Sequence, residues 1–150
     1  MTSQSDVNEF LKEKNLAVVG VSRKGKKFGN IAFNTLQRKG YRVFPVNKSA
    51  EAIDGAVYFN GLNTLPEPVG GVLIVVPPEQ TMKVVLDAAD AGIRKVWMQQ
   101  GAESDEAVRF CNEHGIMCIH GECILMFANP SGFPHGAHRW LWKVLGKLPQ

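Results

Sequence analysis

The chain has 150 residues, of which 45% are hydrophobic and 21% are charged, a balance that allows one globular domain with a buried core. Its formal net charge of +3 is too small to indicate nucleic-acid binding, and no apolar run approaches the length that spans a membrane. The first residues lack the apolar region of a secretory signal, and an odd number of cysteines, three, favours free thiols in the cytoplasm.

Helical and extended segments are expected to alternate along the chain. A short amphipathic helix is predicted over residues 5–14, and the apolar run 16–20 has the pattern of a strand covered on both faces. The next helix, 30–39, ends at Gly40 and leads to a strand over 42–46; residues 56–59 can form a short extended piece. Further strands are predicted at 71–76, 95–98 and 116–119. One helix is predicted to begin at the Pro77-Pro78 pair, and another begins after Ser104 as its N-cap.

Strands that alternate with helices pair in parallel through right-handed crossovers. We therefore predict an α/β fold: a Rossmann-like, doubly wound, parallel sheet of five strands in the order 3-2-1-4-5, with flanking helices. Residues 1–125 are expected to form this domain. Residues 126–150 are a C-terminal extension with an amphipathic helix, and we assign them to the same unit. In such sheets, ligands bind beyond the carboxyl ends of the strands.

A basic, glycine-containing loop follows the first predicted strand. Residues 14–48 carry nine Lys and Arg side chains and no Asp or Glu. Where such charges gather at the start of a helix, the free backbone N–H groups of the helix add to their attraction for an anion. We therefore interpret the loop as a phosphate site, and we interpret Arg38, Lys39 and Arg42 as part of a solvated face.

The details of this loop argue against two common nucleotide sites. The phosphate loop of ATPases needs a hydroxyl to hold magnesium, and Lys27 stands at that position. The NAD fingerprint needs a second glycine where this chain has Ser22, and an acidic residue where it has Asn47 and Lys48. A lysine at the second strand end suits a ribose that carries a phosphate, as in NADP or coenzyme A. The residues alone leave both ligands open.

Three blocks resemble a known family, the small single-domain CoA-binding proteins, which are similar to the N-terminal CoA-binding domain of the succinyl-CoA synthetase α-subunit. They are Val-Val-Gly-Val-Ser at 18–22, Gly-Tyr-Arg-Val-Phe-Pro-Val-Asn at 40–47 and Val-Trp-Met-Gln-Gln-Gly-Ala at 96–102. The resemblance covers about residues 16–123. It implies the same Rossmann-like fold and coenzyme A, or an acyl-CoA, as the ligand. Many relatives have a proline between the residues that correspond to Asn47 and Lys48, and this chain does not.

The resemblance also implies which residues bind the cofactor. The turn after the first strand and the basic loop would meet the phosphates, the end of the second strand would lie beside the adenosine, the third strand end would form an apolar wall, and the fourth would face the pantetheine. The implied residues are Gly20, Val21, Ser22, Arg23, Lys24, Lys27, Phe28, Asn30, Asn47, Lys48, Val76, Pro77, Pro78, Gln100, Gly101 and Ala102.

No catalytic set is evident in the sequence, so we expect binding without catalysis; an NADP-type domain or a subunit of a larger enzyme is the alternative. Cys111, His114, Cys118, His120 and Cys123 are close in sequence, but their expected positions on a helix and a strand scatter them, and we predict no metal site. Cys123 is either a buried structural residue or a thiol near the CoA sulfur. The apolar stripe within 137–145 either docks on its own domain or contacts a second copy or a protein partner.

Overall fold

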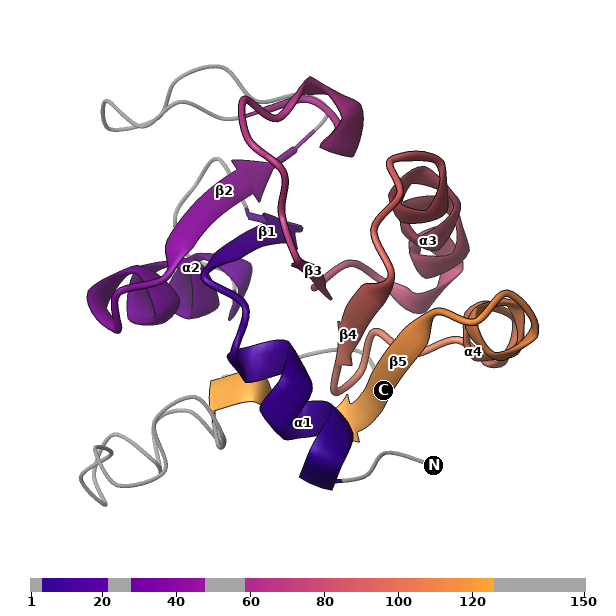
Figure 1. Cartoon of the computed structure of the whole chain (residues 1–150). Coiled ribbons are helices and arrows are strands. Elements are labelled where there is room, and N and C mark those ends of the chain that lie inside the picture. The colour runs from indigo at the N-terminus through magenta and orange to yellow at the C-terminus, as the bar shows by residue number, and fades with distance from the viewer. Residues whose placement is uncertain (1–3, 22–27, 48–58, 126–150) are drawn as a thin grey trace.

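The computed structural model describes residues 4–21, 28–47 and 59–125, which form a five-stranded sheet between two layers of helices (Figure 1). The strands are β1 (Asn15–Val19), β2 (Arg42–Val46), β3 (Gly71–Ile74), β4 (Lys95–Gln99) and β5 (Met117–Glu122). The helices are α1 (Gln4–Leu11), α2 (Phe28–Arg38), the short 3-10 helix η1 (Leu62–Thr64), α3 (Pro78–Asp90) and α4 (Asp105–Glu113).

Every pair of neighbouring strands is parallel, so the predicted Rossmann-like α/β fold class is confirmed. The strand order is β2-β1-β3-β4-β5, which corrects the predicted order 3-2-1-4-5: β3 lies beside β1 and not beside β2. All four residues of β3 are buried, and the middle of a sheet is where such a strand is covered on every side.

Pro45 explains why β2 is the outer strand. Its carbonyl accepts a hydrogen bond of 2.9 Å from the N–H of Phe59, which forms only an isolated parallel bridge to Val46. In a parallel strand, the nitrogen and carbonyl of one residue face the same side, so the Pro45 nitrogen also faces outwards. A proline has no N–H to donate and is tolerated at an edge, which leaves the place beside β1 to β3.

The alternation of side chains along each strand divides the core into two layers. Leu16, Val18, Leu73 and Trp97 face α1 and α2, and Phe10 of α1 packs edge-on against Trp97 with ring centroids 5.4 Å apart. Residues of opposite parity on the same strands face α3 and α4 instead; they are Ala17, Val72, Ile74, Val96 and Met98. Figure 1 shows the two pairs of helices on opposite sides of the sheet.

Helix α4 has well-defined ends. The Ser104 side chain accepts a hydrogen bond of 3.2 Å from the N–H of Ala107, as expected for the predicted N-cap. At the other end, the Arg94 guanidinium donates to the carbonyl of His114 at 3.1 Å, where a positive charge suits the helix dipole. Over residues 4–21, 28–47 and 59–125, the structure contains no helix with both the length and the apolar character needed to cross a bilayer.

Candidate functional site

A cavity of about 510 Å³ lies at the carboxyl ends of β1, β2 and β3, beside the first turns of α3. This is the edge of the sheet at which parallel α/β proteins bind their ligands. The described residues that line it are Val19, Gly20, Val21, Val46, Asn47, Val75, Val76, Pro77, Glu79, Gln80, Lys83 and Val84. The cavity thus gathers predicted residues from three strand ends: Gly20 and Val21, Asn47, and Val76 and Pro77.

Gly20 follows the end of β1 at a point where the structure leaves no space for a side chain. Its φ is +120°, and a Cβ atom would lie 2.1 Å from the carbonyl oxygen of Val75. Its own N–H donates to the carbonyl of Val46 at 3.3 Å. The turn is therefore held between β2 and β3, and no side chain at position 20 separates its backbone from the cavity.

Gly29 brings α2 against the same turn. A Cβ at Gly29 would lie 2.5 Å from the carbonyl oxygen of Gly20, so only glycine allows this approach of helix to strand end. The amino terminus of α2 is therefore next to the Gly20 turn, and the positive end of a helix dipole favours an anion. Sequence analysis missed Gly29, although a glycine at the start of the helix after a Gly-containing turn was the available signal.

Asn47 connects the ends of two strands. Its side-chain amide donates a hydrogen bond of 2.8 Å to the carbonyl of Val21, and its backbone N–H donates to Phe59 at 2.9 Å. Asn47 was predicted to lie beside the adenosine of a cofactor. Asn47 lines the cavity, and it also positions the turn after β1.

The first two turns of α3 contribute side chains that sequence analysis did not include. Glu79, Gln80 and Lys83 line the cavity in the two helical turns that follow Pro77. Lys83 donates to the carboxylate of Asp87 at 2.6 Å, and this hydrogen bond raises the pKa of Lys83 above its ordinary value. The signal was spacing: residues 79, 80 and 83 share one side of a helix whose first turn faces the strand ends.

The end of β4 does not line this cavity. The N–H of Gly101 donates to the carboxylate of Glu103 at 3.2 Å, and the carbonyl of Ala102 accepts from the Thr81 hydroxyl at 2.5 Å. Gln100 is half-buried, and its N–H donates to Glu122. Gln100 and Ala102 thus connect the end of β4 to β5 and α3 through their backbones, and the role of residues 100–102 beside the pantetheine stays a prediction.

Gln99 is the buried glutamine of this segment. It is fully enclosed, and its side-chain oxygen accepts a hydrogen bond of 3.0 Å from the N–H of Ile124. Its side-chain nitrogen has no hydrogen-bond partner in the described structure. The register between β4 and β5 shifts between Trp97 and Gln99, an irregularity that the sequence pattern does not indicate.

The other predicted residues fall into two groups. Phe28 and Asn30 are buried in the first turn of α2, and Pro78 is half-buried at the start of α3; none of the three lines the cavity. Ser22, Arg23, Lys24, Lys27 and Lys48 lie outside the described residues, as does the apolar stripe within 137–145.

The cysteines and histidines after residue 110 are distributed over a helix and a strand. In the described parts of the chain, no three Cys, His, Asp or Glu side chains are grouped as metal ligands. Cys111 and Cys118 face each other: their hydrogen bond lowers the pKa of Cys111 and, together with burial, raises that of Cys118. Cys123 is buried in the core layer of α1 and α2.

Comparison with known proteins places this cavity in context. The sequence profile of the family described as the CoA binding domain matches residues 14–129. An uncharacterized protein of Bacillus subtilis, YneT, is 27% identical over 123 residues, which cover 81% of this chain and 91% of that protein. The solved structure of a conserved hypothetical protein from Pyrococcus furiosus is 37% identical, with a TM-score of 0.71 over 75% of this chain and 97% of its own.

A larger protein contains a similar segment. The alpha subunit of the ADP-forming acetate–CoA ligase II of Pyrococcus furiosus is 25% identical over 126 residues. The match covers 77% of this chain but only 28% of that subunit. The two proteins therefore share one domain, and most of the ligase subunit has no counterpart here.

Proposed function

The chain belongs to the CoA-binding domain family, and on this premise we propose that it binds coenzyme A or an acyl-CoA in the cavity beyond β1, β2 and β3. One observation carries the proposal: the cavity joins a turn without side chains, at Gly20, to an apolar wall at Val76 and Pro77. Phosphates need backbone N–H groups and positive charge, whereas the adenine ring needs apolar surface. Apolar surface at Val76 and Pro77 and the positive charge of Lys83 both line this cavity of about 510 Å³, and the glycine at position 20 keeps the turn clear of a side chain.

The direction of the ligand follows from the chemistry of the cavity walls. We propose that the phosphates lie at the Gly20 turn and the amino terminus of α2. The basic residues predicted from sequence, Arg23, Lys24 and Lys27, precede that helix in the chain. The adenosine then lies between Asn47 and the first turns of α3, where Lys83 supplies positive charge to a ribose phosphate. Sequence analysis predicts the same role for Lys48, the residue after Asn47 in the chain.

We propose that the chain binds this ligand without catalysis of its own. Among the described residues that line the cavity, the ionisable side chains are Glu79 and Lys83, and Lys83 is paired with Asp87. A nucleophile, a base and a group that orients the base would be needed for acyl transfer. The cytoplasm, where CoA metabolism and free thiols are found together, is the location we propose.

Calorimetric titration tests the proposal directly. The full chain is titrated with CoA, acetyl-CoA, dephospho-CoA, NADP and ATP. We expect CoA or acetyl-CoA to bind at least tenfold more tightly than NADP and ATP. Tight binding of NADP without a CoA signal would overturn the proposal, and so would the absence of binding by all five ligands.

A variant that fills the cavity tests its location. Val76→Trp places a large side chain at the cavity wall, and we expect it to abolish CoA binding. Leu86→Trp is the matched control, because Leu86 is 39% exposed on α3 and does not line the cavity. Unchanged CoA affinity in Val76→Trp would place the ligand elsewhere.

Lys48→Ala tests recognition of the ribose phosphate. It is expected to weaken the binding of CoA but to leave the binding of dephospho-CoA nearly unchanged.

A further inference from the structure

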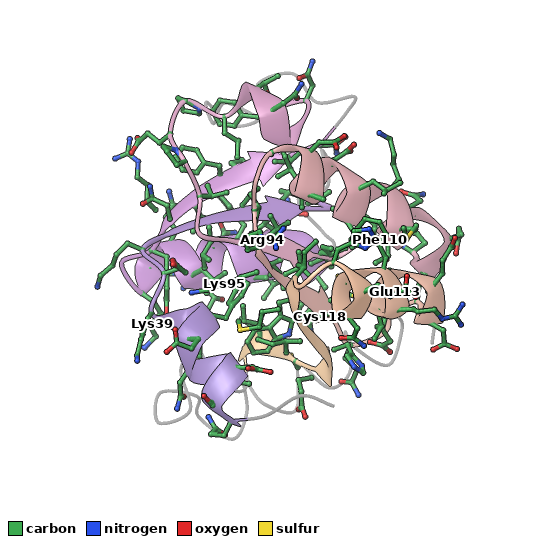
Figure 2. All side chains as sticks on the ribbon, turned by 45° about the vertical axis from the view of Figure 1, so that its right-hand side comes forward. Lys39, Arg94, Lys95, Phe110, Glu113 and Cys118 are labelled. Atoms are coloured by element: carbon green, nitrogen blue, oxygen red, sulfur yellow. The ribbon has the colours of Figure 1, made fainter. Side chains whose placement is uncertain are left out.

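Thr81 is a fully buried polar residue of α3 that binds the chain just after the end of β4. Its hydroxyl donates a hydrogen bond of 2.5 Å to the carbonyl of Ala102, a residue that is also buried. Ala102 belongs to the loop that joins β4 to α4. Figure 2 shows α4, the helix that carries Phe110 and Glu113, beside α3. The hydrogen bond therefore ties one helix of this layer to the loop that leads into the other.

The position of Thr81 on α3 is one that core packing alone would give to an apolar side chain. The buried residues of this helix share one face at helical spacing: Thr81, Val84, Val85 and Ala88. The last three belong to the core on this side of the sheet. A hydroxyl in such a row loses its hydrogen bonds to water and lowers stability unless it finds a partner. The carbonyl of Ala102 is that partner, so the threonine suits the fixing of the loop better than the filling of the core.

The same turns of α3 form one wall of the proposed CoA cavity. Glu79, Gln80 and Lys83 line the cavity, whereas Thr81 does not. In the strand order β2-β1-β3-β4-β5, the end of β4 is the next strand end beyond those that line the cavity. A ligand that is longer than the cavity and continues along the carboxyl edge of the sheet therefore meets the loop after β4. CoA is such a ligand, because its pantetheine arm extends beyond its diphosphate.

The loop of residues 100–102 has further hydrogen bonds at the ends of β4 and β5. The N–H of Gln100 donates to the carbonyl of Glu122 at 3.2 Å, and the N–H of Gly101 donates to the carboxylate of Glu103 at 3.2 Å. Of these three hydrogen bonds, that of Thr81 is the one made by a helix that lines the cavity. It therefore connects the position of the loop to the wall of the cavity.

We propose that Thr81 is a positioning residue for the pantetheine arm of CoA: its hydroxyl holds the loop of residues 100–102 in the place where the arm binds. The inference rests on the proposed function, because it requires CoA in the cavity beyond β1, β2 and β3. It divides the site into two parts. The adenosine and the phosphates depend on the cavity, whereas the arm depends on the loop. A change at Thr81 thus affects ligands that carry the arm and spares those that end at the diphosphate.

The test compares CoA with 3′-phospho-ADP, which matches CoA up to its diphosphate and lacks the arm. In calorimetric titrations of the full chain, Thr81→Val is expected to weaken CoA about tenfold and to change 3′-phospho-ADP by less than about twofold, because valine leaves the buried Ala102 carbonyl without its donor. Thr81→Ser keeps the hydroxyl and should bind CoA within about threefold of the unmodified chain. Thr64→Val is the matched control: it removes a hydroxyl–carbonyl bond of 2.7 Å to Gly61, outside the cavity, and should leave both affinities nearly constant.

Amide hydrogen exchange of the unmodified chain keeps the test decisive if Thr81→Val does not fold. CoA is expected to slow exchange in residues 99–103, whereas 3′-phospho-ADP should leave exchange there unchanged. Equal weakening of both ligands by Thr81→Val, a Thr81→Ser variant as weak as Thr81→Val, or no protection of residues 99–103 by CoA would overturn this inference and leave the proposed function standing. An unmodified chain that does not bind CoA would overturn both.

Discussion

The side chain of Asn47, at the end of β2, donates a hydrogen bond of 2.8 Å to the carbonyl of Val21, just beyond the end of β1. The two residues are 26 positions apart in the chain, yet both line the same cavity. The bond fixes the turn against which we propose that the CoA phosphates lie. Loss of this bond is therefore expected to affect both the stability of the sheet edge and the affinity for CoA.

Asn47→Asp is expected to weaken CoA binding about tenfold and to lower the free energy of unfolding by about 1–3 kcal/mol. The substitution removes the donor and places a carboxylate oxygen next to the Val21 carbonyl. Calorimetry with CoA and urea denaturation measure the two effects. Asn34→Asp is the control, because Asn34 is exposed on α2 and its change should leave both quantities nearly constant.

Gly29→Ala is expected to destabilise the protein, although alanine is normally favoured over glycine inside a helix by about 1 kcal/mol. The reversed sign follows from the close approach of α2 to β1, since the added Cβ would lie 2.5 Å from the Gly20 carbonyl oxygen. Urea denaturation gives the sign, and calorimetry should show weaker CoA binding. A gain in stability would mean that α2 moves freely away from the turn.

Gly20→Ala is expected to be more destabilising than Gly40→Ala. Both glycines have positive φ, +120° and +97°, so the backbone strain of alanine is of order 1–3 kcal/mol at each. At Gly40 the added Cβ meets nothing within 4 Å, whereas at Gly20 it would lie 2.1 Å from the Val75 oxygen. Unfolding in urea compares the two variants, and equal losses would contradict the close packing at the cavity.

Lys83 and Asp87 are expected to affect CoA affinity in opposite directions. Lys83→Met removes a positive charge from the cavity wall and should weaken binding about two- to fivefold, the size expected for an exposed charge pair. Asp87→Asn releases Lys83 from its partner and should strengthen binding by a similar factor. Calorimetric titration of both variants is the measurement. Equal weakening by both would show that the ion pair acts only by shaping α3.

Tyr41 is expected to make stability fall at alkaline pH. Its hydroxyl donates a hydrogen bond of 2.7 Å to the Leu11 carbonyl, and burial raises the pKa of Tyr41 above its ordinary value of 10.0. The folded state therefore favours the protonated phenol, so this contribution is complete below pH 10 and is lost as pH rises through the folded pKa. Between pH 8 and 11, the free energy of unfolding measured in urea should fall less steeply with pH for Tyr41→Phe than for the unmodified chain. Parallel curves for the two proteins would contradict this role.

The predicted site residues divide according to how local their signals are. Gly20 and Asn47 were identified because each directly follows an apolar strand, and a strand end is a local feature of the chain. Glu79, Gln80 and Lys83 were missed because their spacing shows only that they share one side of α3, whereas their place in the cavity depends on how α3 packs over β3. Gln100 was named from the family resemblance, whereas the shift in register between β4 and β5 beside Gln99 is invisible to a pattern of alternation.

The sequence by itself determined the succession of strands and helices, the covered character of β1 and the family of the chain. These follow from hydrophobic periodicity, glycine and proline positions and three short motifs, all of which act over a few residues. Only the tertiary structure decided that β3 lies beside β1, that α3 lines the cavity, and that Thr81 binds Ala102. These relationships join segments far apart in the chain, so they depend on how whole elements pack and on no local pattern.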